Sequence, residues 1–159
     1  MSKNIPITIS GFKKLKNELN NLKNVKRQKI INNIKMARAH GDLKENAEYH
    51  AAREEQSFCE GRIKEIENKL SNINVIDIKK IPNKNKVVFG VTVTIMNVSS
   101  KKYFTYKIVG EDESNFKNNL ISIFSPISRG LIGKYVGQIS TIKTPNGNIK
   151  YKIINVDHL

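Results

Sequence analysis

The sequence predicts an α+β protein. Residues 1–78 should form a long antiparallel coiled-coil hairpin of two helices, and residues 79–159 a small antiparallel β-sheet domain with one short helix. Two long segments repeat apolar residues every three or four positions, the period of an amphipathic helix. A short polar segment with Gly41 separates them. After residue 79, strict alternation of apolar and polar residues replaces the helical period, as in half-buried strands.

Each helical segment carries one narrow apolar stripe. Because only a few residues connect the segments, we expect antiparallel neighbours. No third stripe appears before Lys79, so the hairpin should project as a finger about 40 Å long. The first stripe contains Phe12, Leu15, Leu19, Leu22, Val25, Ile30, Ile34 and Ala37, and the second contains Ala47, Ala51, Phe58, Ile63, Ile66, Leu70 and Ile73.

Charge is distributed unequally between the predicted arms. Residues 1–40 contain ten Lys or Arg and one acid, whereas residues 41–78 contain nine acids and five bases. Opposite charges on facing arms favour this pairing, although each exposed pair contributes only about 0.3–0.5 kcal/mol.

The second domain is predicted from four runs of strand-like residues after an alternating segment, Val87 to Ile95. Between two of them, Ser125 and Pro126 are the cap and first residue of a short helix that Gly133 closes. A turn at residues 145–148 joins the last two strands. There is no Trp, Gly-rich phosphate loop or nucleophile–base pair here, which indicates a docking module. The runs are Tyr103 to Val109, Leu120 to Phe124, Gln138 to Thr144 and Ile149 to Val156.

The composition predicts the cellular compartment of the protein and the type of partner it binds. No apolar run approaches a membrane span, the N-terminus lacks the apolar core of a signal peptide, and Cys59 is the single cysteine. A soluble protein of the reducing cytoplasm is expected, with Cys59 as a small buried hydrophobe. The net charge of +14 suggests a polyanionic partner. Because Lys outnumbers Arg 23 to 5 in a chain rich in Asn and Ile, an AT-rich coding bias explains much of that charge equally well.

Asp42 and Glu45, between the arms, permit two interpretations. The pair is nearly a capping box, so helix capping alone could explain both acids. Alternatively, the two carboxylates could hold part of the shell of a hard ion such as Mg²⁺, with the other ligands supplied by a partner. Arg38 and Arg53 flank the pair and could bind a phosphate.

Other polar residues of the hairpin have simpler interpretations. His40 and His50 flank the acids, but their separation is not a standard zinc spacing, and solvated or lightly packed imidazoles are expected. Arg27 and Arg62 are interpreted as ordinary solvated helix charge.

The segment from Arg38 to Glu54, Arg-Ala-His-Gly-Asp-Leu-Lys-Glu-Asn-Ala-Glu-Tyr-His-Ala-Ala-Arg-Glu, resembles the signature of the Gre family of bacterial transcript cleavage factors. The similarity continues through Phe58-Cys59-Glu60-Gly61-Arg62-Ile63 and the run from Ser125 to Lys134, and it covers essentially the whole chain. A motif of this length in a predicted hairpin is far more specific than a short pattern.

The resemblance implies a function. In the family, the N-terminal coiled coil enters the secondary channel of RNA polymerase, and an FKBP-like C-terminal domain binds the channel rim, here through Ser125 and Pro126. Asp42 and Glu45 would help place the second Mg²⁺ of the polymerase, which then cleaves its own backtracked transcript, while Arg38 and Arg53 would hold the extruded RNA. The factor itself would be a monomer that binds no cofactor alone. Phe124 departs from the polar residue expected at the rim contact.

Three alternatives differ in class. A nonspecific nucleic-acid-binding protein would use the same charge but has no need of paired acids at its tip. A channel-binding regulator without cleavage stimulation would lack the acid pair or add further acids. A prolyl isomerase is suggested by the FKBP-like fold alone, and fold does not establish function.

Overall fold

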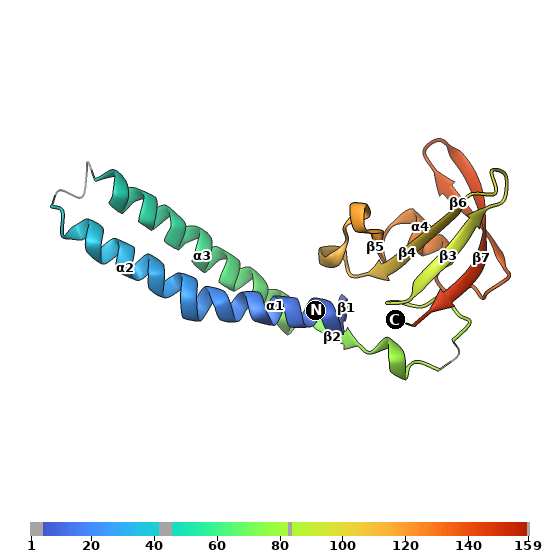
Figure 1. Cartoon of the computed structure of the whole chain (residues 1–159), viewed down its shortest axis with the longest axis horizontal. Helices are drawn as coiled ribbons and strands as arrows, with labels where there is room; N and C mark the ends of the chain where they lie inside the picture. The colour runs from blue at the N-terminus through green and yellow to red at the C-terminus, as the bar shows by residue number, and fades with distance from the viewer. Residues whose placement is uncertain (1–4, 42–45, 83, 159) are drawn as a thin grey trace. The chain divides into compact units, whose positions relative to one another are not determined.

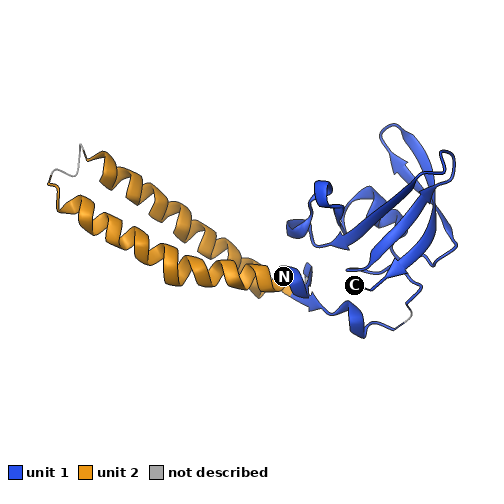
Figure 2. Cartoon of the chain, viewed as in Figure 1, with its two compact units in different colours: residues 1, 3–11, 74–159 blue, residues 2, 12–73 orange. Residues whose placement is uncertain are grey.

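A computed structural model of the chain describes residues 5–41, 46–82 and 84–158. Two compact units are distinguished (Figure 2): residues 12–73 form a helical unit, and residues 3–11 together with 74–159 form a sheet unit. Residues 3–11 thus group with the C-terminal part of the chain, which the predicted bounds 1–78 and 79–159 do not anticipate. No helix in the described part of the chain is long and apolar enough to cross a membrane.

The helical unit is the predicted antiparallel hairpin (Figure 1). The first arm contains α1 (Ile9–Asn21), a π-helical turn η1 (Leu22–Lys26) and α2 (Arg27–Arg38), and the second arm is α3 (Ala47–Ser71). At 1.5 Å per residue, the 25 residues of α3 extend about 37 Å. The core between the arms contains Leu22, Ile30, Ile34, Ala52, Cys59, Ile63 and Ile66.

The π turn corrects the predicted first stripe. Val25 is 59% exposed, whereas Leu22 and Ile30 are buried. Ile30 follows Leu22 by eight positions, and in a regular α-helix the two side chains would lie about 80° apart around the axis. A π turn absorbs one extra residue, so both side chains return to the same face. Val25 lies within that turn and faces solvent.

In the second arm, the buried stripe differs from the predicted one by one position at two places. Ala52 and Cys59 are buried, while the predicted Ala51 and Phe58 are exposed. Cys59 is buried, as predicted, and its Sγ lies 3.8 Å from the carbonyl oxygen of Leu22, to which the thiol can donate.

The sheet unit contains a five-stranded sheet in the order β5-β4-β3-β7-β6. All neighbouring pairs are antiparallel except β4 and β5, which are parallel, so the sheet is mostly antiparallel and the predicted fold class is confirmed. The helix α4 (Pro126–Leu131) packs against β6, and buried residues of α4 and the strands share one core. The strands are β3 (Thr92–Asn97), β4 (Tyr103–Val109), β5 (Leu120–Ser122), β6 (Ile139–Thr144) and β7 (Gly147–Asp157).

The predicted strand from Val87 to Ile95 is regular only from Thr92. Its alternating apolar residues are all buried, but Gly90 interrupts the extended backbone with φ = +91°. A Cβ at this position would lie 2.2 Å from a methyl group of Ile78. Glycine is therefore needed here for both backbone conformation and close packing.

Two short strands, β1 (Ile5–Thr8) and β2 (Ile73–Ile76), pair with each other and were not predicted. After β1, Thr8 caps α1, because its Oγ1 accepts a hydrogen bond from the Gly11 amide at 3.0 Å. The Glu113 carboxylate accepts hydrogen bonds from the Thr8 hydroxyl and, at 2.9 Å, from the Gly110 amide. These contacts attach residues 5–11 to the rest of the sheet unit.

Candidate functional site

The described residues on either side of the predicted acidic pair form a frame at the end of the hairpin. The helix α2 ends at Arg38, after which the His40 amide donates to Ala37 at 3.2 Å and the Gly41 amide to Arg38 at 3.3 Å. Gly41 has φ = +105°, a conformation that favours glycine and ends the helix.

Asn46 connects the two arms at this end. Its Nδ2 donates to the carbonyl oxygen of Ala37 at 2.7 Å, and its Oδ1 accepts from the Tyr49 amide at 3.1 Å as the N-cap of α3. One side chain therefore adds a second donor to the Ala37 carbonyl at the end of α2 and satisfies a free amide at the start of α3. This bridging role of Asn46 is not predicted from the sequence.

Asp42 and Glu45 lie outside the described residues, so their placement at the tip stays a prediction. Asn46, however, is the N-cap of α3, which begins at Ala47. The N-cap of α3 is therefore Asn46 and not Asp42. The interpretation that Asp42 serves only to cap this helix is weakened accordingly.

Arg38 and Arg53 are both exposed, at the last residue of α2 and in the second turn of α3. Arg53 Nη1 donates to Gln56 Oε1 at 3.1 Å. Within residues 5–41, 46–82 and 84–158, neither guanidinium forms an ion pair with a carboxylate. The chemistry of both side chains suits an external anion, and their role in binding RNA stays a prediction.

Ion pairs between the arms support the frame. Lys23 pairs with Glu67 at 3.3 Å and Arg27 with Glu60 at 2.8 Å, which places bases of the first arm against acids of the second. Arg62 binds Glu18 in the opposite sense through two hydrogen bonds of 2.7 and 2.9 Å. The interpretation of Arg27 and Arg62 as merely solvated was wrong, because both join one arm to the other.

These pairs shift the pKa values of their members. Hydrogen bonding from Arg62, together with its positive charge, lowers the pKa of Glu18 despite partial burial. The same contact raises the pKa of the Arg62 guanidinium, and Glu60 raises that of Arg27. All of these groups are partly exposed, so each pair contributes modestly to stability.

The histidines near the tip do not complete a metal site with described residues. His40 is exposed, and the ring of His50 contacts that of Tyr49 edge to face at 5.7 Å. In the part of the chain that the structure describes, no three His, Cys, Asp or Glu residues are grouped so that they could hold a metal ion.

The predicted docking residues of the sheet unit lie at the start of α4. Ser125 Oγ accepts from the Ser128 amide at 3.2 Å, and Pro126 is the first helical residue, as predicted. The preceding Phe124 is 50% exposed, so α4 begins beside an accessible aromatic ring.

Comparison with known proteins agrees with this architecture. A family model described as "Transcription elongation factor, N-terminal" matches residues 5–75, and one described as "Transcription elongation factor, GreA/GreB, C-term" matches residues 82–158. The fold, a helical hairpin followed by a small sheet unit, is thus that of a transcription elongation factor, because both units match family models of that class. The chain belongs to the GreA/GreB family of transcription elongation factors.

Individual relatives are similar over nearly their full length. Transcription elongation factor GreA of Buchnera aphidicola subsp. Schizaphis graminum is 64% identical over 98% of both chains. The GreA of Yersinia pestis is 57% identical over 99% of both. Among solved structures, the GreA/GreB factor from Nitrosomonas europaea is 19% identical with a TM-score of 0.43, covering 97% of this chain and 98% of that one.

Proposed function

We propose that this chain enters the secondary channel of bacterial RNA polymerase through its hairpin and stimulates Mg²⁺-dependent cleavage of the 3′ end of backtracked RNA. The observation that supports this most is the frame at the hairpin end. Asn46 links the two helix ends, ion pairs farther along the arms join one arm to the other, and the four residues between Gly41 and Asn46 include both Asp42 and Glu45. The 57–64% identical relatives named as GreA support the same assignment.

Asp42 and Glu45 would act on the metal site of the polymerase. Their carboxylates are hard oxygen donors of the type that Mg²⁺ prefers, and two of them fill only part of its shell. The polymerase would supply the remaining ligands. The ion, when bound, would activate the attacking water and stabilise developing charge on the phosphate. The acids would add ligands and orient that water, so the chain would stimulate the polymerase's own cleavage activity.

Arg38 and Arg53 would hold the extruded RNA. Both are exposed on opposite arms, one on each side of the acidic segment in sequence. Guanidinium groups can bind a phosphate through two parallel hydrogen bonds, which positions the RNA as well as attracting it. Positioning of the scissile phosphate would therefore come partly from the arginines, and the chemistry from the acids and the ion.

The sheet unit would dock the factor on the channel rim through the start of α4, at Ser125 and Pro126. The exposed Phe124 beside them offers apolar contact area where the family resemblance led us to expect a polar side chain. The factor would act as a monomer in the cytoplasm, where transcription occurs.

A reconstituted reaction tests this function. Purified protein is added to a stalled, backtracked polymerase complex that carries 3′-labelled RNA, and short 3′ fragments are measured over time. Fragments should accumulate faster than with polymerase alone, and the protein without polymerase should release none. Binding without faster cleavage would instead support a channel-binding regulator, and binding to free RNA without polymerase would support a nonspecific nucleic-acid-binding protein.

A further inference from the structure

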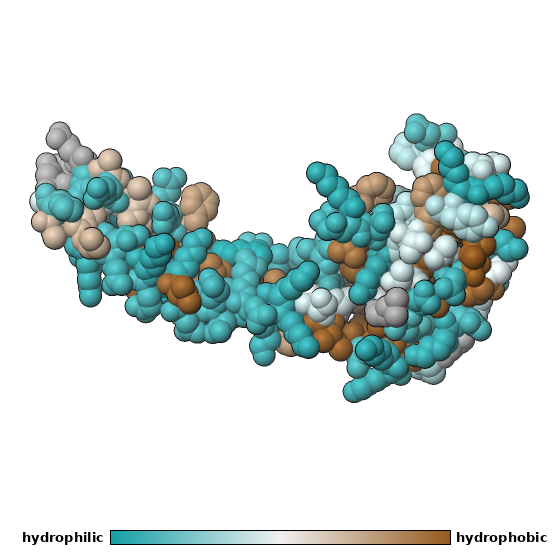
Figure 3. Space-filling view, in the orientation of Figure 1, coloured by the Kyte–Doolittle hydropathy of each residue, from teal (hydrophilic) through white to brown (hydrophobic). Residues whose placement is uncertain are grey.

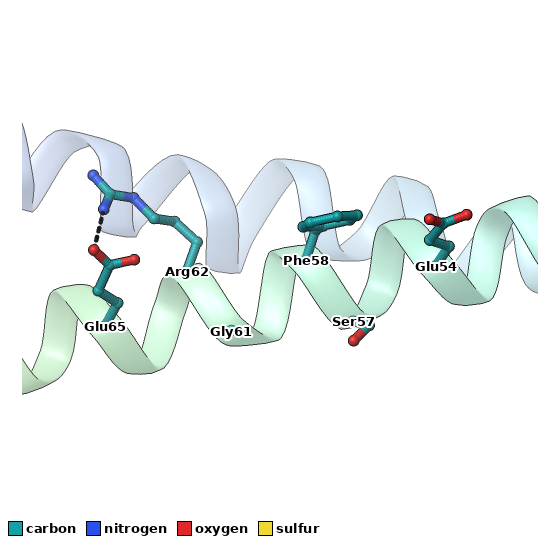
Figure 4. A pocket seen from close by; sticks show the side chains of 6 residues that line it. All are labelled: Glu54, Ser57, Phe58, Gly61, Arg62 and Glu65. Carbon is teal, nitrogen blue, oxygen red and sulfur yellow. Dashed lines mark ion pairs between the residues drawn. The ribbon is translucent and has the colours of Figure 1, made fainter.

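A surface groove lies along α3, and apart from Arg62, which joins the arms, its lining residues have no role described above. Figure 4 shows its lining, and its volume is about 560 Å³. Glu54, Phe58 and Arg62 follow one another at four-residue spacing and point to the same side of the helix. The full lining is Glu54, Ser57, Phe58, Gly61, Arg62 and Glu65.

Phe58 contributes most of the apolar character of this groove. Its side chain is 74% exposed, the largest exposure among the large hydrophobic residues in the described part of the chain. The hairpin face seen in Figure 3 is predominantly hydrophilic, with separate apolar patches. A phenylalanine held in water by a rigid helix contributes little to folding, but it is well suited to entering a pocket on a partner.

Gly61 gives independent support. It lies inside the 25-residue helix α3, where glycine is less favourable than alanine. A Cβ built at Gly61 would meet no atom within 4 Å, and the residue does not have positive φ. Gly11 differs, because a Cβ there would lie 2.1 Å from Glu113. Packing within the described structure therefore requires glycine at position 11 but gives no reason for it at position 61.

We propose that Phe58 and the gap left by Gly61 form a docking site for a protein segment that presents an apolar side chain beside a Lys or Arg. Under the proposed function, on which this inference rests, that segment belongs to the wall of the polymerase channel. The apolar side chain would pack against the Phe58 ring and occupy the space above Gly61, and the basic group would face Glu54.

The charges of the groove favour a basic protein segment over RNA. Glu65 is already paired with Arg62 at 3.1 Å and with Lys69 at 3.2 Å, and Arg62 also binds Glu18. Glu54 is exposed and has no ion pair among residues 5–41, 46–82 and 84–158. The unneutralised charge of the lining is therefore negative, which repels phosphate and attracts a Lys or Arg.

Three variants test the site on polymerase core without nucleic acid, by displacement of the fluorescently labelled parent protein. Phe58→Ala should weaken binding roughly tenfold, as expected for loss of a buried aromatic contact. Gly61→Leu should weaken binding by at least as much while raising the melting temperature of the hairpin, because Leu favours helix. Glu54→Gln should slow association and make it less sensitive to salt.

Phe116→Ala is the matched control, since Phe116 is almost as exposed as Phe58, at 72%, but lies in the sheet unit. It should bind like the parent. The inference is overturned if Phe58→Ala and Gly61→Leu bind as tightly as the parent. It is also overturned if Phe116→Ala is equally weakened, or if the Phe58 defect appears only when extruded RNA is present. If the parent itself fails to bind polymerase, the proposed function fails instead.

Discussion

Asn46 shows how much one side chain can contribute to the geometry of a tip. It caps α3 and donates to Ala37 at the end of α2. Asn46→Ala should cost about 1–2 kcal/mol, because a cap and a bridging hydrogen bond are both lost. Asn46→Asp should retain the cap but place a carboxylate against the Ala37 carbonyl.

Both variants should therefore melt below the parent when helix content is followed by circular dichroism. Asn46→Ala should melt lowest, because it loses the cap as well as the hydrogen bond to Ala37. Asn33→Ala, at an exposed position inside α2, is the matched control and should change stability by less than about 0.5 kcal/mol. Equal melting of Asn46→Ala and Asn33→Ala would show that Asn46 does not hold the arms together.

Glu18 gives the hairpin a dependence on pH. Arg62 lowers the pKa of Glu18 in the folded state, so the pair stabilises the fold above the unfolded pKa of about 4.3. This stabilisation is lost as the pH falls through the lower folded pKa. Since both side chains are more than one third exposed, we expect about 0.5–1 kcal/mol.

Glu18→Gln should accordingly melt about 1–4 °C below the parent at neutral pH, and the difference should disappear in acid well below the folded pKa. Melting curves of both proteins across this range measure it. A difference that stays constant with pH would mean that Arg62 contributes through packing and not through the charge of Glu18.

At the scale of elements, the π turn decides which apolar side chains of the first arm contribute to stability. The apolar pattern alone would assign Val25 to the core. Val25→Ala should change stability by less than about 0.5 kcal/mol, because Val25 faces solvent. Ile30→Ala should cost about 2–5 kcal/mol, because Ile30 is 2% exposed between the arms. Chemical unfolding of both variants decides the matter, and a comparable loss for Val25→Ala would contradict the π turn.

The helical period predicted both arms and their pairing because one stripe must bury against another. It failed at Val25 because the π turn adds one residue between Leu22 and Ile30 and so changes the phase of the stripe there. Phe58 was assigned to the core because it is apolar, although the neighbouring Cys59 has the correct phase. Its exposure points to a role outside the chain.

The sheet unit was predictable where alternation was strong, as in Tyr103 to Val109, and less so where contacts are distant in sequence. The parallel pairing of β4 with β5 follows a connection through two short 3₁₀ turns that no local pattern predicts. The contact of Thr8 with Glu113 joins residues 105 positions apart. The charge pattern and the motif predicted the candidate tip residues. The two hydrogen bonds by which Asn46 links α2 and α3 could be found only in the structure.

For the whole molecule, experiments should distinguish the role of Arg38 and Arg53 in binding RNA from the role of Asp42 and Glu45 in cleavage. Replacing Arg38 and Arg53 by Ala should weaken engagement with backtracked RNA and flatten the salt dependence of cleavage stimulation. Each lost contact should lower the log–log slope by roughly 0.7, as for single strands. High factor concentration should restore much of the rate. A double variant with the parental salt slope would show that both arginines are only solvated charge.

The central claim is that Asp42 and Glu45 supply ligands and not merely helix structure. The most direct measurement is fragment release from a backtracked complex as Asp42→Asn is titrated to saturation beside the parent. Asn removes the negative charge but caps a helix about as well as Asp, so folding and polymerase binding should be unchanged. Cleavage stimulation should be largely lost at every concentration, because saturating the channel cannot supply the missing ligand. Parental rates at saturation would contradict the claim.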